Sequence, residues 1–212
     1  GRRSFIDQAR RAQIVECAID VIAEGGFAAA TLAEIARRAG VSKGVISYHF
    51  AGKDELIHEV VVSVYTEGGA FMRPWLEAES TAAGRLRAYI CSNIAYMKAH
   101  PRRMLALIEI FTNFRTGDGR LHFDAAGNEP ILQALEDVFR RGQESGEFRS
   151  FDPRVMAQSL RAAIDAVPGQ VALHPELDLD AYAQELAELF DRATRLSPEV
   201  DGSRAEPEMA SR

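Results

Sequence analysis

The 212-residue chain has little of what builds disulfide-stapled, metal-binding or membrane-spanning proteins. Its two cysteines, Cys17 and Cys91, are far apart in sequence and have no metal-ligand spacing. Two cysteines are too few for a disulfide framework and fit a reducing compartment. No apolar run approaches the ~18 residues that a membrane span needs, and no signal-peptide core is found near the N-terminus. We therefore expect a cytoplasmic protein with no membrane partner and no metal site.

Motifs of catalysis are also missing. The sequence has no glycine-rich phosphate loop, no nucleophile elbow and no clustered histidines. Its five histidines are scattered, and His122 beside Asp124 is a weak pair in a predicted loop. We expect no catalytic residues, no cofactor and no enzymatic activity. An enzyme on a helical scaffold is the alternative that detectable turnover or a tightly bound metal would support.

The alternation of apolar and polar residues that marks strands is not sustained anywhere, whereas helical spacing is frequent. The sequence predicts an all-α fold of about nine helices without internal repeats. Residues 116–128 are expected to form a loop and residues 197–212 a disordered tail. The predicted helices cover approximately 5–24, 31–39, 42–50, 53 to beyond 65, 81–99, 101–115, 128–145, 153–172 and 178–195.

Charge is distributed unevenly along the chain, although the formal net charge is −6. Residues 1–53 carry eight Lys or Arg against five Asp or Glu, and the remainder carries 17 against 26. A basic segment attached to an acidic one is typical of a phosphate-binding module joined to a different domain. We expect a domain at 1–53 and a second one at 54–196.

The stretch 31–50, TLAEIARRAGVSKGVISYHF, has the pattern of a helix-turn-helix. Thr31 and Ser42 are suited to cap two short helices, with Glu34 completing a capping box for the first. Gly40 can adopt the positive φ of the turn between them. Ala36 is small at the expected crossing point, so the second helix can be presented to a major groove. An ordinary helical hairpin is the alternative.

The same stretch resembles the DNA-binding head of the TetR family of bacterial repressors. The matching residues are Thr31, Ile35, Ala36, Ala39, Gly40, Val41, Ser42, Gly44, Tyr48, His49, Phe50, Lys53 and Leu56. The resemblance implies a three-helix head followed by a larger helical domain for effector binding and dimerisation. It also implies that double-stranded operator DNA is the partner and that residues 42–48 enter the major groove. The expected DNA-binding residues are Thr31, Ser42, Lys43, Gly44, Ser47, Tyr48, His49 and Lys53.

The chemistry of these residues agrees with a role at DNA. Ser42 and Lys43 lie at a helix N-terminus, where backbone N–H groups and a cation suit a phosphate or a guanine edge. Gly44 costs ~1 kcal/mol inside a helix, and close approach of backbone to DNA or simple tolerance could explain it. Many relatives have an aromatic residue in place of Ser47, so the operator sequence cannot be carried over. Four arginines near the N-terminus either contact DNA as an arm or form a solvated basic end: Arg2, Arg3, Arg10 and Arg11.

One helix-turn-helix covers too few base pairs for useful specificity, so we expect a homodimer bound to paired half-sites. The resemblance places the interface on the last two long helices, whose apolar stripes could equally be intramolecular core. The expected interface residues are Met156, Leu160, Ile164, Val167, Tyr182, Leu186, Leu189 and Phe190.

The middle helices combine large apolar side chains with polar groups that are expensive to bury without partners. This combination is usual for a small-molecule site, although each aromatic alone could be plain core. The expected effector-binding residues are Trp75, Tyr89, Asn93, Tyr96, Met97, Met104, Ile108, Glu109, Phe111 and Asn113. Glu109 among aromatics would suit a cationic ligand.

Together these patterns predict a transcriptional regulator, a repressor that a small-molecule effector releases from its operator. The effector would favour a spacing of the two heads that does not fit the half-sites, and the helix from Lys53 would connect head and body. An activator or a ligand-independent DNA-binding protein is the alternative within this class.

Overall fold

The computed structural model describes residues 2–115, 117, 119–121 and 129–196, with side chains from Phe5 onward. The predicted tail at 197–212 and most of the predicted loop at 116–128, including His122 and Asp124, lie outside the described residues. Every regular element in the described part is a helix, which confirms the all-α prediction. None of these helices is long and apolar enough to cross a membrane. The elements are α1 (Arg2–Gly25), η1 (Phe27–Ala29), α2 (Leu32–Ala39), α3 (Lys43–His49), α4 (Lys53–Glu77), α5 (Ala82–Ala99), α6 (Pro101–Asn113), α7 (Glu129–Glu144), α8 (Pro153–Asp165), α9 (Val167–Leu173) and α10 (Leu179–Thr194).

Side-chain caps begin several helices where the sequence predicted. Thr31 accepts a hydrogen bond from the Glu34 amide at 3.1 Å, and Ser42 accepts one from the Val45 amide at 3.3 Å. The predicted capping box is only half formed. The Glu34 carboxylate instead pairs with Arg37, while the Thr31 amide donates to the Ala29 carbonyl.

The helix predicted over 153–172 is two helices, α8 and α9. The break follows from Pro168, which lies in the first turn of α9. A proline inside a helix has no N–H to donate and collides with the preceding turn, so the helix restarts there. The short 3₁₀ helix η1 after Gly26 was not predicted, because three residues leave no periodicity to detect.

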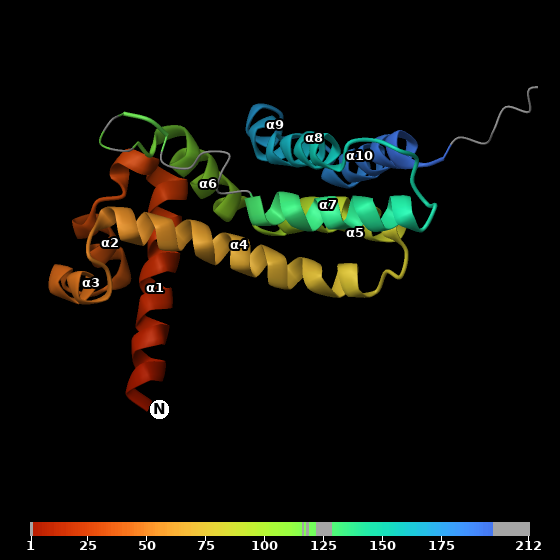
Figure 1. The fold of residues 1–212 in the computed structure, drawn as a ribbon. Helices are drawn as coiled ribbons and strands as arrows, with labels where there is room; N and C mark the ends of the chain where they lie inside the picture. The colour runs from red at the N-terminus through yellow and green to blue at the C-terminus, as the bar shows by residue number, and fades with distance from the viewer. Residues whose placement is uncertain (1, 116, 118, 122–128, 197–212) are drawn as a thin grey trace, which may run out of the picture.

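The buried residues form two separate hydrophobic cores. The first joins α1, α2, α3, α4 and α6 with Tyr96 of α5, and the second joins α5, α7, α8 and α10 with Val167 of α9. Figure 1 shows α5 and α7 as a middle layer between α4 on one side and α8, α9 and α10 on the other. Met97 is half-buried and packs against both cores. The cores therefore meet along α5.

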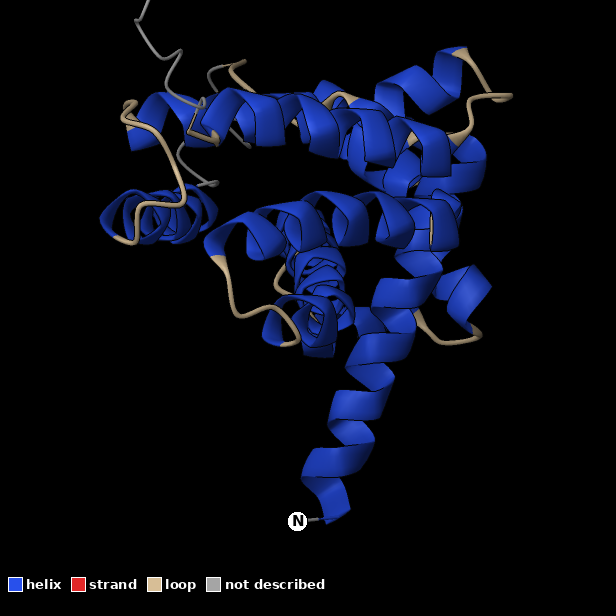
Figure 2. Ribbon diagram, turned by 90° about the vertical axis from the view of Figure 1, so that its right-hand side faces the viewer, coloured by secondary structure: helices blue, strands red, loops and turns tan. Residues whose placement is uncertain are grey.

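The N-terminal head is continuous with the body in its packing. The first core contains Ile14 and Ile46 from the head together with Met104 and Ile110 from α6. In both ribbon views α1 projects away from the layered body, with its N-terminus at the far end (Figures 1 and 2). The boundary predicted after residue 53 does not coincide with a gap in the packing, and it stays a prediction about function.

Candidate DNA-binding site

The helices α2 and α3 are held at a fixed angle by a tight turn. Gly40 has φ 65°, in the left-handed region that glycine adopts without strain. The amides of Gly40 and Val41 donate back to the last turn of α2, which closes the helix end. Ile46 of α3 and Ala36 of α2 are buried in the first core, so α3 is fixed against the head by its inner face.

The outer face of α3 is polar and exposed. Ser42, Lys43, Gly44 and Ser47 are all exposed, and the Tyr48 side chain is 75% exposed. A large aromatic residue left this open has no role in the core. Its ring contacts the His49 ring edge to face, with centroids 5.0 Å apart. The face therefore offers hydroxyl, amine and phenol groups to a partner.

Lys53 has contacts within the chain that the sequence did not predict. Its Nζ donates to the Phe27 carbonyl oxygen at 3.2 Å and lies 4.3 Å from the centroid of the Phe27 ring. Burial lowers the pKa of this amine. The Lys53 ammonium thus links the start of α4 to Phe27 of η1, a contact that the sequence alone does not indicate.

Several arginines that give the head its basic charge are already paired. Arg37 binds Glu34, Arg38 binds Glu24, and the Arg11 guanidinium donates to Glu59 at 2.8 Å. Arg11 also donates to the His49 carbonyl oxygen and lies over the Phe50 ring, which ties α1 to the end of α3. The net charge of the head therefore overstates the number of cations that can contact phosphates. Exposed Lys43 on α3 becomes a more important candidate for a phosphate contact.

The head and body are joined at Phe27 by two side chains. The Glu109 carboxylate of α6 accepts a hydrogen bond from the Phe27 amide at 3.0 Å, while Lys53 of α4 donates to the Phe27 carbonyl. We call these two bonds the Phe27 clamp. Asn113 also donates to the Glu109 carboxylate, at 3.2 Å. Glu109 is thus half-buried and has partners at the junction, and its place in a cationic effector site stays a prediction.

Several of the other expected effector residues belong to the first core or pack against it. Tyr96 and Met104 are buried in the first core, with the Tyr96 hydroxyl donating to the Val64 carbonyl at 3.2 Å. Met97 and Phe111 pack against that core from its edge, and Ile108 is half-buried. For Tyr96 and Met104 the interior packing explains the side chains without a ligand.

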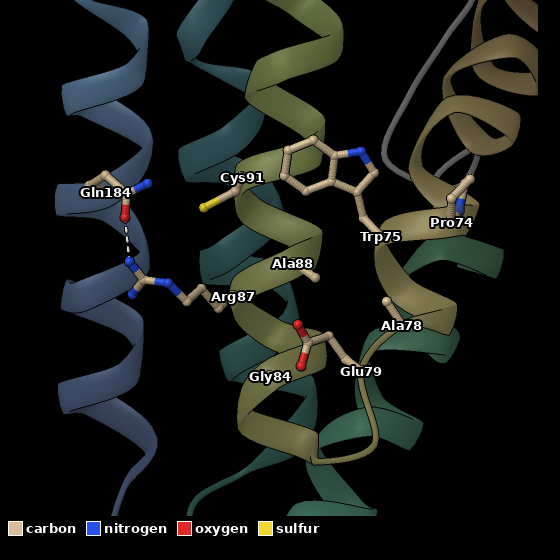
Figure 3. Close-up of a pocket in the computed structure, with 9 residues that line it drawn as sticks. All are labelled: Pro74, Trp75, Ala78, Glu79, Gly84, Arg87, Ala88, Cys91 and Gln184. Carbon is tan, nitrogen blue, oxygen red and sulfur yellow. Dashed lines mark hydrogen bonds between the residues drawn. The ribbon is translucent and has the colours of Figure 1, made fainter.

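Trp75 lines an open groove of about 500 Å³ between the end of α4, α5 and α10. Figure 3 shows its indole beside Cys91, with Arg87 of α5 donating to Gln184 of α10 on the far side. None of the other expected effector residues lines this groove.

Sequence reasoning missed a buried arginine in the body. Arg161 of α8 is 7% exposed and pairs with Asp165 one turn along the same helix. It also donates to the Tyr89 hydroxyl of α5 at 2.9 Å. The sequence analysis placed Tyr89 at an effector site but did not predict a role for Arg161. Arg161 lies within the apolar stripe of α8, whose pattern indicated only packing.

The expected interface residues are divided between interior and surface. Five of the eight are buried in the second core of the same chain, namely Leu160, Ile164, Val167, Leu186 and Phe190. A side chain buried in its own protomer is not available to a partner, so the interface assignment is corrected for these five. Met156 and Tyr182 are half-buried, and Leu189 is 60% exposed.

Comparison with known proteins agrees with this architecture. Residues 14–60 match the family model described as bacterial regulatory proteins, tetR family. The chain is 30% identical over 184 residues to the HTH-type transcriptional regulator BetI 1 of Chromohalobacter salexigens, covering 82% of this chain and 85% of that one. The chain belongs to the TetR family of bacterial transcriptional regulators.

Solved structures with the same fold cover nearly the whole chain. SmeT, the repressor of a Stenotrophomonas maltophilia multidrug efflux pump, superposes with a TM-score of 0.73 at 24% identity, covering 93% of this chain and 96% of that one. The regulator FadR from Bacillus subtilis in complex with stearoyl-CoA has a TM-score of 0.72 at 22% identity, covering 84% and 96%. At these identities the likeness concerns the fold.

Proposed function

We propose that this regulator is a dimeric repressor that binds operator DNA through α3 and leaves it when a small-molecule effector binds the body. The observation that carries the proposal is the outer face of α3, with exposed Ser42, Lys43, Ser47 and Tyr48 on a helix whose inner face is locked into the core. Recognition of a major groove requires a helix whose inner face is fixed by packing and whose outer face carries polar side chains. The repressor SmeT and the ligand-bound FadR, which share the fold, give the mode of action a precedent.

The test is fluorescence anisotropy of the full chain against DNA from upstream of its own coding sequence and against a scrambled duplex. The titrations are repeated across a salt series, because phosphate contacts release counterions and make affinity fall with salt. Preference for the native duplex, with saturation in multiples of two chains, supports the proposal. Equal affinity for both duplexes limits the protein to nonspecific binding at this site, and no binding to either at low salt overturns the proposal.

For the dimer, we infer that the C-terminal helices supply the contact between protomers. Large apolar side chains remain exposed there, among them Val155 of α8, Leu173 at the end of α9 and Leu189 of α10. Exposed apolar side chains on neighbouring helices are characteristic of subunit interfaces. The residues proposed for the interface are therefore the exposed ones and not those of the second core.

Leu189→Glu tests this interface. It places a charge on the proposed contact surface, and because Leu189 is exposed the packing of the protomer core is not altered. Sedimentation velocity should show a dimer for the wild type and a monomer for Leu189→Glu. Leu105→Glu on α6 is the matched control, since Leu105 is also exposed and lies outside these helices. A dimer that survives Leu189→Glu, or is lost equally in Leu105→Glu, would contradict the proposed interface.

A further inference from the structure

The open groove beside Trp75 owes its space to small residues on one side of α5. Gly84, Ala88 and Cys91 form its floor, at spacings of four and three residues that place them on one face of the helix. The end of α4 supplies one wall, and Gln184 of α10 lines the other side. Short side chains on the floor leave the volume of about 500 Å³ between these walls (Figure 3).

The α4 side of this groove carries an aromatic ring and a carboxylate. Trp75 is 45% exposed, and Glu79 follows it four residues later, just past the end of α4. In Figure 3 both side chains extend from the end of α4 toward α5. The groove therefore presents a flat apolar surface and a negative charge about one helical turn apart.

The surroundings of the Glu79 carboxylate supply it with no hydrogen-bond donor among the described residues. It packs over Gly84, where an added Cβ would lie 2.3 Å from its Oε2. The backbone amide of Gly84 does not serve it, because that amide donates to the Thr81 hydroxyl at 3.0 Å. Arg85 donates to the backbone carbonyl of Glu79 at 3.1 Å and forms no ion pair with its carboxylate. The charge of Glu79 therefore remains available to a molecule in the groove.

The unpaired carboxylate is also accessible. Glu79 is half-buried, and no buried side-chain nitrogen or oxygen of the described residues lacks a hydrogen-bond partner. An oxygen of Glu79 without a partner is consequently open to water and to a ligand. The positive charge on the opposite side is different, because the Arg87 guanidinium already donates to Gln184. The groove thus favours a cation over an anion.

We propose that this groove binds a small aromatic amine in its protonated form, with the ammonium on Glu79 and the ring against Trp75. The N–H groups of an ammonium supply the donors that the carboxylate lacks, and such charged hydrogen bonds are stronger than neutral ones. The indole and the small floor residues suit a flat ring. This inference rests on the proposed function and names the chemical class of its effector.

The groove joins two parts of the body that the proposed function uses. Helix α4 runs from Lys53, which belongs to the Phe27 clamp, to Trp75 in the groove. Helix α10 carries Gln184 at the groove and Leu189 at the proposed interface. An amine that fills the space between these helices would favour one position of α4 relative to α10, and with it one spacing of the two heads.

The experiment uses the fluorescence of Trp75, the single tryptophan of the chain, as a reporter of the groove. The full chain is titrated with benzylamine and phenethylamine and with the matching alcohols, and isothermal titration calorimetry gives the affinities. At least one amine should change the Trp75 emission and bind more tightly than its alcohol, which has the same ring and no charge. Phenethyltrimethylammonium keeps the charge but has no N–H, so it should bind more weakly than phenethylamine. Phenylacetate should bind more weakly still.

Two variants assign the binding to the groove. Glu79→Gln keeps the size of the side chain and should weaken the amine by about three- to tenfold, a range that allows for screening in an open groove, while leaving the alcohol unchanged. Trp75→Leu should weaken amine and alcohol by a similar factor, because both lose the ring contact. Glu77→Gln is the matched control, since Glu77 is an exposed carboxylate at the end of α4 that does not line the groove.

Operator binding separates this inference from the function on which it rests. The amine site is overturned if neither amine binds, if an alcohol or phenylacetate binds as tightly, or if Glu79→Gln has no more effect than Glu77→Gln. Preference for the native duplex in that case leaves the DNA-binding function intact. Amine binding that depends on Glu79, in a chain that binds neither duplex, supports the site and overturns the function. Both hold if the bound amine also lowers operator affinity and Glu79→Gln reduces that effect.

Discussion

Replacing Gly44 by alanine separates the stability of α3 from its contact with DNA. A glycine inside a helix is destabilising by ~0.8–1.0 kcal/mol relative to alanine. The structure has room for the methyl group, because the nearest atom to a Cβ built at Gly44 is the Ser42 Oγ at 3.6 Å. The variant should therefore gain up to about 1 kcal/mol, which for a chain of this size raises Tm by roughly 2 to 4 °C.

Operator affinity should move the other way. Gly44 lies in the first turn of α3 on the exposed side, beside Lys43. If the backbone there approaches DNA closely, a methyl group pushes α3 away from the groove and weakens its contacts. Loss of one good contact, at ~1–3 kcal/mol, corresponds to a decrease in affinity of about 5- to 150-fold.

Gly69→Ala is the matched control. Gly69 is also exposed and helical, in α4, and a Cβ built there meets no atom within 4 Å. Differential scanning fluorimetry should show the same rise in Tm for both variants, and anisotropy should show unchanged affinity for Gly69→Ala. Unchanged or tighter DNA binding by Gly44→Ala would refute the close approach, and a lower Tm would refute the argument from open space.

Three more outcomes follow from the described contacts. Lys43→Ala should reduce the slope of log affinity against log salt by about one, whereas Lys98→Ala, exposed in the body, should leave it unchanged; equal slopes in wild type and Lys43→Ala would remove Lys43 from the phosphate contacts. Two amides at the start of α5 donate to the Glu147 carboxylate and hold its pKa below the ordinary value of 4.5. Because the folded pKa is lowered, this stabilisation is present above pH 4.5 and is lost as the pH falls through the folded pKa. Glu147→Gln should cost about 1 kcal/mol in urea unfolding at neutral pH and much less in acid, and an equal loss at both would contradict the assignment. Gly142→Ala should cost about 1–3 kcal/mol, because its Cβ would lie 2.1 Å from the Phe148 ring, and Phe148→Leu in that background should recover part of the loss.

Local signals explain why the head could be predicted closely. Thr31 and Ser42 act on amides three residues away, and Gly40 sets its own turn. Each of these effects is contained in a short window of sequence. The break at Pro168 was missed because proline is also common in a first turn, and the pattern over 153–172 allowed one long helix.

The candidate sites were harder to predict because they depend on contacts between distant residues. Lys53 and Glu109 meet Phe27 from different helices, which their own neighbours in sequence do not reveal. The apolar stripe of α8 could not tell Leu160, which faces the core, from Val155, which faces solvent. Arg161 was passed over for the same reason, since its partner Tyr89 is 72 residues away.

The Phe27 clamp provides a mechanical connection through which a movement of α4 or α6 can reach the head. Both backbone polar groups of Phe27 are bonded: its amide donates to Glu109 of α6, and its carbonyl accepts from Lys53 of α4. Hydrogen bonds to charged groups contribute about 1.5–3 kcal/mol each, so the two together equal or exceed the ~1–3 kcal/mol that typically couples two sites. Because the two bonds together are at least as strong as such a coupling, we expect a displacement of α4 or α6 to move η1 with it and not to break the clamp. In the proposed dimer, the direction of that movement would decide whether the two α3 helices spread apart or close together.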